Sequence, residues 1–103
     1  MVVKSFFQDE ILYITLSGEI NEQSVQSGRA ECDRLIEEHS NAKKIIINLA
    51  ETKFMDSTGL GFLIGRHKKA LALSIPIYLQ SPNPAADTIL KLGGIYKLMP
   101  KIE

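Results

Sequence analysis

The stretch that decides the fold is KIIINLAETKFMDSTGLG, residues 44–61. It begins with a nearly continuous run of apolar, β-branched side chains, which is typical of a central strand covered on both faces of a sheet. After a predicted loop over residues 50–55, the apolar spacing becomes helical, and a helix is expected from Ser57 or Thr58 to about Leu73. A buried strand followed by a helix indicates an α/β fold.

The segments on either side extend this pattern. Residues 2–7 and 11–17 are predicted strands, and the three polar residues between them allow a hairpin but no crossover helix. Asn21 is a predicted N-cap of an acidic amphipathic helix that ends near His39. The remaining predicted elements are a strand over residues 75–79, a helix over 84–92 capped by Asn83, and a short strand within 95–102. The predicted order β-β-α-β-α-β-α-(β) describes one domain over residues 1–103, a mixed β-sheet opening with an antiparallel hairpin, with α-helices packed against it.

Composition argues against several classes of protein. The 103 residues carry 12 basic and 12 acidic side chains, without the basic excess of nucleic-acid-binding and membrane-surface proteins. No apolar stretch approaches the roughly 18 residues of a membrane span, and the N-terminus does not resemble a signal peptide. The only cysteine, Cys32, is expected to be buried in the first helix, and a cytoplasmic location is expected. The charges are uneven along the chain, because residues 1–56 are net acidic and residues 57–103 are net basic.

The segment FMDSTGLG, residues 54–61, lies where ligands and reactive groups most often lie in open α/β sheets. Unpaired backbone N–H groups and the positive end of the helix dipole meet there, so a hydroxyl of Ser57 or Thr58 is a candidate phosphate acceptor. The alternative is that Asp56 or Ser57 only caps the helix and that the glycines which follow only permit close packing. Both hypotheses remain open at this point.

Enzyme sites fit these residues poorly. An aspartic protease needs Asp directly before Thr-Gly or Ser-Gly, whereas Ser57 separates Asp56 from Thr58. A serine hydrolase needs a histidine within reach of Ser57, but His39 falls at a helix end and His67 is expected on the packed face of the second helix. The glycine pattern lacks the tight strand-to-helix turn of a dinucleotide site, and no cluster has metal-ligand spacing. We therefore expect no catalytic residue, no metal and no cofactor.

The two faces of the second helix are assigned from a rotation of 100° per residue. The inward face is expected to carry Leu60, Leu63, Ile64, His67 and Leu71. Phe62, Arg66 and Lys69 lie on the opposite face, and we expect them to form an exposed partner-binding patch about one turn from Ser57. The alternative is that Phe62 packs under a neighbouring loop or helix.

The motif DSTGLG, residues 56–61, resembles the STAS domain family in its strand-loop-helix context, and within it the stand-alone bacterial anti-sigma factor antagonists. The resemblance continues through the opening hairpin and most of the chain. It includes GEI at 18–20, the strand at 45–49, IGRHK at 64–68 and LGGIYKL at 92–98.

The resemblance implies a partner switch that is not an enzyme. An anti-sigma factor that is itself an ATP-dependent serine kinase would phosphorylate Ser57, and a metal-dependent serine phosphatase would reverse this. The unphosphorylated form would bind the anti-sigma factor and release sigma, with Asp56, Thr58 and Gly59 supporting the phosphosite. Asn21, which stands where the family often has an acidic residue near the phosphoacceptor loop, is expected to contact the partner. The alternative is an interaction module of another signalling complex, in which Ser57 is unmodified.

Overall fold

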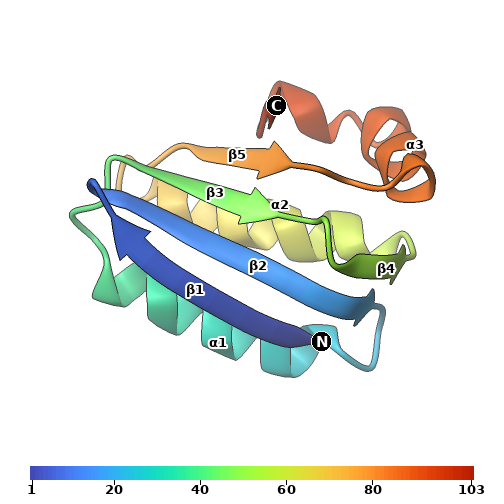
Figure 1. The fold of residues 1–103 in the computed structure, drawn as a ribbon, viewed down its shortest axis with the longest axis horizontal. Coiled ribbons are helices and arrows are strands. Elements are labelled where there is room, and N and C mark those ends of the chain that lie inside the picture. Colours follow the sequence, from blue (N-terminus) through green and yellow to red (C-terminus); the bar gives the residue numbers. More distant parts are fainter.

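A mixed six-stranded sheet forms the centre of the computed structural model, which describes residues 1–103 (Figure 1). The strands are β1 (Val2–Gln8), β2 (Ile11–Ile20), β3 (Lys44–Asn48), β4 (Thr52–Met55), β5 (Ile77–Gln80) and β6 (Lys101–Ile102). The helices are α1 (Val25–Glu38), α2 (Thr58–Leu71) and α3 (Pro84–Leu92), followed by a 3₁₀ turn at Ile95–Lys97. The strand order is β1-β2-β3-β5-β6, and β4 pairs with the end of β2. The predicted mixed α/β fold is confirmed, and β3 is the middle strand of this order.

The sheet opens with the antiparallel hairpin that the sequence predicted. β1 and β2 pair from Val2 opposite Ser17 to Gln8 opposite Ile11. Asp9 and Glu10 form the turn with φ of 54° and 65°, the left-handed backbone that matches the twist of the two strands. Every other pair of neighbouring strands is parallel.

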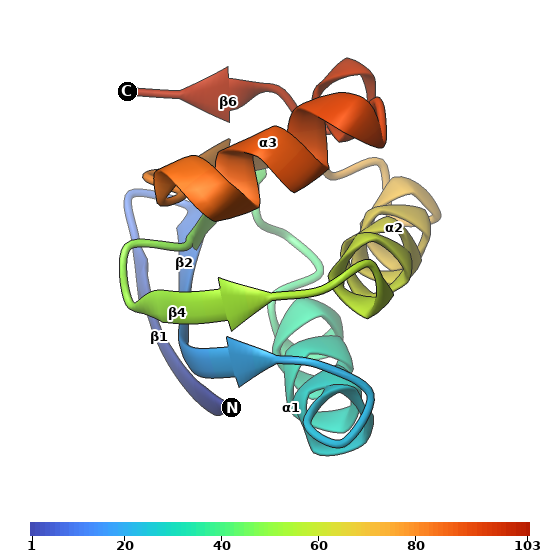
Figure 2. The ribbon, with the colours of Figure 1, turned by 90° about the vertical axis from the view of Figure 1, so that its right-hand side faces the viewer.

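The helices α1 and α2 lie on one face of the sheet, and the opposite face carries no helix (Figures 1 and 2). The prediction that the central strand is covered on both faces is therefore wrong. Ile46 of β3 points to the open face yet is only 7% exposed, because it lies between Tyr13 of β2 and Tyr78 of β5. Aromatic side chains of neighbouring strands shield it in place of a helix.

Strand β4 was predicted as part of a loop, and this prediction is wrong. β2 continues three residues beyond its predicted end at Ser17, through Gly18, where φ is +100° and the register shifts. The extension provides a partner for Thr52–Met55, which pairs in parallel with it. The buried Thr52 hydroxyl donates to the carbonyl oxygen of Leu16 at 2.8 Å. β4 therefore exists because of a distant segment, and it ends directly before the motif.

The predicted N-cap of α3 is confirmed, whereas the predicted start of α1 is wrong. Asn83 caps α3, its side-chain oxygen accepting from the N–H of Ala86 at 2.8 Å. Asn21 does not cap α1, which begins at Val25 after Ser24. Its side-chain oxygen accepts instead from the N–H groups of Gln23 and Ser24 in the preceding turn. The predicted helix start was early because Asn also caps turns.

Cys32 lies in α1 and is 1% exposed, as predicted. Burial raises the pKa of its thiol to about 12. The thiol therefore stays protonated at neutral pH, and it packs as a small apolar side chain.

The hydroxyl that joins β4 to β2 provides a test of this part of the fold. Replacing Thr52 by valine keeps the shape and removes the donor, so we expect Thr52→Val to lower the free energy of unfolding by about 1–2 kcal/mol. Urea denaturation measures this. The control is Thr88→Val, which removes an exposed hydroxyl on α3 and is expected to stay within about 0.5 kcal/mol of the wild type. Equal losses in both variants would contradict the importance of the buried bond.

Candidate functional site

The motif lies where β4 passes into α2, beside the end of β2. Met55 of β4 pairs with Ile20 of β2, and the N–H of Asp56 donates to the carbonyl oxygen of Ile20 at 3.3 Å. Asn21 follows Ile20 directly, so the structure places it next to the segment that precedes α2, as predicted. Asn21 also lines a separate hollow of about 500 Å³ between the end of β2 and the turn before α1 on one side and Lys53 on the other.

Asp56, not Ser57, caps α2 with its side chain. Its Oδ1 accepts from the N–H of Thr58 at 2.9 Å, and its carbonyl oxygen accepts from the N–H of Gly59 at 2.9 Å. Ser57 has helical backbone angles, φ −64° and ψ −19°, and its side chain makes no capping hydrogen bond. The hydroxyl of Ser57 is therefore exposed and chemically available at the first turn of α2.

The glycines of α2 differ in what surrounds them. A Cβ on Gly59 would come within 2.4 Å of Cγ of Met55, so this glycine is needed for close packing. At Gly61 and Gly65 nothing lies within 4 Å of a Cβ position. The hypothesis that the glycines only permit close packing therefore holds for Gly59 and fails for the other two.

Phe62 is buried, so the prediction of an exposed aromatic side chain is wrong and the packed alternative is confirmed. It is 6% exposed, and its ring lies 3.4 Å from the position that a Cβ on Gly28 of α1 would take. Conversely, Leu71, predicted to face inward, is 62% exposed. The reason is that α2 packs against both the sheet and helix α1 (Figure 2). Residues such as Leu63 are buried toward the sheet and Phe62 is buried toward α1, so the buried side of α2 is rotated toward α1.

Arg66 and Lys69, also predicted to be exposed, form ion pairs with α1. Arg66 is 6% exposed, with Nε 2.8 Å from Oδ1 of Asp33. Burial lowers the pKa of the Arg66 guanidinium, the charge of Asp33 opposes this, and the nearby charge of Arg29 adds to it. Lys69 is half-buried and pairs with Glu37. These cations therefore hold α2 to α1, and an exposed patch composed of them is ruled out.

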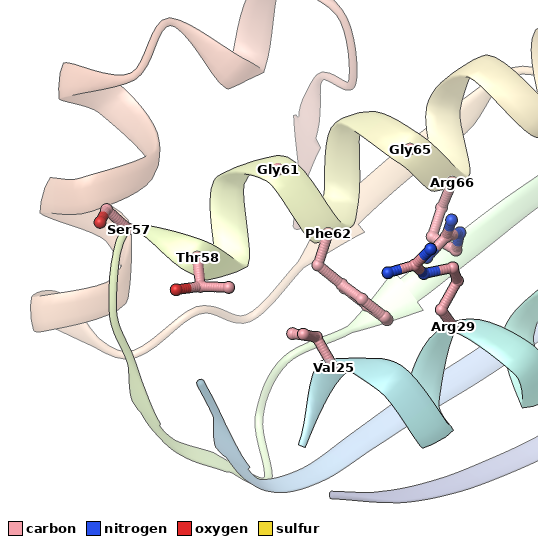
Figure 3. A pocket seen from close by; sticks show the side chains of 8 residues that line it. All are labelled: Val25, Arg29, Ser57, Thr58, Gly61, Phe62, Gly65 and Arg66. Carbon is pink, nitrogen blue, oxygen red and sulfur yellow. The ribbon is translucent and has the colours of Figure 1, made fainter. Parts of the chain in front are cut away.

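The space between the two helices is hollow beside Ser57. We call it the α1–α2 hollow; it measures about 410 Å³ and is lined by Val25, Arg29, Ser57, Thr58, Gly61, Phe62, Gly65 and Arg66 (Figure 3). Sequence reasoning missed Val25 and Arg29 as lining residues. Their spacing of four places them on one face of α1, but which helix that face meets depends on tertiary packing.

Neither of the two histidines is placed to act as a base for Ser57. His67 lies on the same helix ten residues further on, which is about 15 Å along the axis. His39 follows the end of α1, where its ring lies against Phe7. No group of three or more potential metal ligands occurs in the structure. None of its helices has the length and apolar character needed to cross a bilayer.

Comparisons with known proteins agree with this geometry. The STAS domain model matches residues 5–103. The anti-sigma F factor antagonist of Paenibacillus polymyxa is 30% identical over 90 residues, which are 87% of this chain and 76% of that protein. The solved structure of the anti-sigma factor antagonist SpoIIAA in its unphosphorylated form has a TM-score of 0.80 and 25% identity, covering 99% of this chain and 89% of that one. Its phosphorylated form, from Bacillus, has a TM-score of 0.72 with 25% identity and coverages of 99% and 92%.

The capping role of Asp56 leads to a prediction about α2. Asp56→Ala removes the acceptor, and we expect the free energy of unfolding to fall by about 1 kcal/mol. Asp56→Asn keeps an acceptor oxygen and is expected to stay within about 0.5 kcal/mol of the wild type. Urea denaturation of both variants measures the difference. A similar loss in the two would show that the charge of Asp56, rather than its hydrogen bond, stabilises the helix.

Proposed function

The chain belongs to the STAS domain family, and on this premise we propose that it is an anti-sigma factor antagonist switched by phosphorylation of Ser57. The unphosphorylated form binds an anti-sigma factor and thereby releases sigma. Phosphorylation at Ser57 ends that binding. The protein acts as a regulatory binding partner and not as an enzyme.

The observation that carries this proposal is the state of the Ser57 hydroxyl. It is exposed at the first turn of α2, and it is not used for capping because Asp56 fills that role. A phosphoryl group can therefore be added without breaking a hydrogen bond of the fold. The positive end of the helix dipole favours a negative group at this place.

The residues around Ser57 have separate supporting roles. The hydrogen bond to the N–H of Thr58 holds the carboxylate of Asp56 in one orientation beside the acceptor serine. Gly59 allows the first turn to pack directly on Met55. We propose that Asp56 supports phosphotransfer, while Thr58 and Gly59 fix the backbone that presents Ser57.

The switch acts at the contact surface and leaves the fold intact. A phosphoserine carries about −1.5 to −2 charges at neutral pH, and a helix N-terminus stabilises negative charge by about 0.3–1 kcal/mol. The phosphate is therefore compatible with α2, whereas its charge and bulk occupy a surface on which the partner would lie. Loss of binding follows without unfolding.

The proposed partners are an anti-sigma factor with serine kinase activity and a metal-dependent serine phosphatase. The name of the Paenibacillus relative, anti-sigma F factor antagonist, supports the first. Partners of this kind act in the cytoplasm, and the reduced Cys32 fits that compartment. We assign neither nucleic acid nor membrane as a partner, since the formal net charge is zero.

The proposed contact surface is centred on Ser57 and includes Asn21. Asn21 lies beside the motif because the N–H of Asp56 donates to the carbonyl oxygen of the preceding residue, Ile20. Phe62 and Arg66 are too buried to form an exposed patch, and they take part by shaping the α1–α2 hollow next to Ser57. Lys69 belongs to the same helix face further along α2, where Glu37 pairs with it.

Phosphorylation and binding assays test the proposal together. With the cognate anti-sigma factor and ATP, we expect mass spectrometry to find one phosphate, on Ser57, which is lost in Ser57→Ala and retained in Thr58→Ala. Calorimetric titration is expected to show binding of the anti-sigma factor to the wild type and at least about tenfold weaker binding to Ser57→Asp. The phosphorylated protein is expected to keep its melting temperature and its amide spectrum outside residues 55–65.

Two outcomes would contradict the proposal. Equal binding of the anti-sigma factor to wild type and Ser57→Asp would show that negative charge at Ser57 does not switch off binding. Absence of any binding to the anti-sigma factor, with Ser57 unmodified by its kinase activity, would favour an interaction module of another signalling complex.

A further inference from the structure

The α1–α2 hollow is kept open by two glycines that packing does not require. Gly61 and Gly65 line it one turn apart on α2, and neither has an atom within 4 Å of a Cβ position. Glycine inside a helix lowers stability relative to alanine. α2 therefore carries two residues that are unfavourable in a helix, at positions that line the hollow and that no close contact reserves for glycine.

One end of this hollow holds an excess of positive charge. Arg66 reaches it from α2, almost completely buried, and Arg29 reaches it from α1 (Figure 3). Asp33 is the only carboxylate that pairs with either arginine, through Nε of Arg66, and Arg29 is exposed and forms no ion pair. Two guanidinium groups therefore share one counter-charge, and Arg29 remains available for a second anion.

The rest of the hollow combines two apolar side chains with the two glycines and the hydroxyl residues Ser57 and Thr58. Val25 of α1 and the ring of Phe62 line it, and the guanidinium of Arg66 lies 5.0 Å from the centre of that ring (Figure 3). At about 410 Å³ the space is much larger than a single oxyanion requires. Its chemistry suits a group with an anionic head and an apolar body.

We infer that the α1–α2 hollow receives an acidic side chain and an adjoining apolar side chain of the anti-sigma factor, with the carboxylate bound by Arg29. This inference rests on the proposed function, because a protein partner is chosen for its continuity with Ser57, which lines the same hollow. It also supplies a local cause for the switch. A phosphate on Ser57 adds negative charge at the other end of the hollow, and this charge repels the partner's carboxylate (Figure 3).

Titration with the cognate anti-sigma factor tests the site. Arg29 is exposed, so Arg29→Gln is expected to fold normally and to bind about tenfold more weakly. Arg29→Lys is expected to recover part of the affinity. The wild-type affinity is expected to fall as salt rises, and Arg29→Gln is expected to show a smaller slope.

The glycines provide the sharper test, since their effects on stability and on binding have opposite signs. Gly61→Ala and Gly65→Ala are expected to keep or raise the melting temperature, because alanine favours the helix and no atom lies close by. The same variants place a methyl group in the hollow and are expected to weaken partner binding about fivefold or more. A merely structural role of these positions would change stability and leave affinity unaltered.

Matched controls come from the same two helices. Arg34→Gln removes an exposed arginine of α1 that pairs with Glu31 and Glu38 instead of lining the hollow. Lys68→Ala changes an exposed position of α2. Both are expected to bind within about twofold of the wild type.

The outcomes separate this inference from the proposed function. If the wild type binds the anti-sigma factor and Ser57→Asp does not, while Arg29→Gln, Gly61→Ala and Gly65→Ala bind like the wild type, the hollow is not the contact and only this inference fails. If the wild type itself does not bind, the proposed function fails and the inference fails with it.

Discussion

The ion pair between Arg66 of α2 and Asp33 of α1 fixes how the two helices of the site face each other. With Arg66 turned toward α1, the residue one turn earlier, Phe62, must also face α1, and Ser57 at the helix start is left outside. Removing Asp33 leaves the nearly buried guanidinium of Arg66 without its counter-charge, which lowers stability. The α1–α2 hollow, the buried aromatic ring and the exposed serine therefore depend on how α1 packs on α2, two segments that are far apart in the chain.

This dependence explains which predictions from the sequence hold. The hairpin, the central strand and the cap of α3 by Asn83 follow from local patterns, and the structure confirms them. Strand β4 does not, because its pairing requires β2 to continue past Gly18. Phe62 was placed outside because a projection of one helix assumes a single buried face, and it contains no information about a second helix. Burial of Arg66 requires a carboxylate, and that carboxylate lies in another helix.

The sequence placed the motif correctly between a strand and a helix, but it did not decide whether Asp56 or Ser57 caps α2. Asp56 and Ser57 are both common N-cap residues, and local sequence does not decide between them. The structure decides through one hydrogen bond, from the N–H of Thr58 to the carboxylate of Asp56. A serine cap would accept from the N–H of Gly59 or Leu60, but these groups donate to the carbonyl oxygens of Asp56 and Ser57, so the serine hydroxyl is left without a capping bond.

The uneven distribution of charge along the chain also acquires a structural meaning. The acidic first half and the basic second half meet where α1 packs on α2, and Asp33 and Glu37 pair with Arg66 and Lys69. The two halves therefore neutralise each other along this interface and form no opposed surface patches there. A phosphate added to a protein of zero net charge is then the dominant local charge near Ser57. It acts on whatever binds that surface, because Arg66 and Lys69, the cations of α2 at the interface with α1, already have partners.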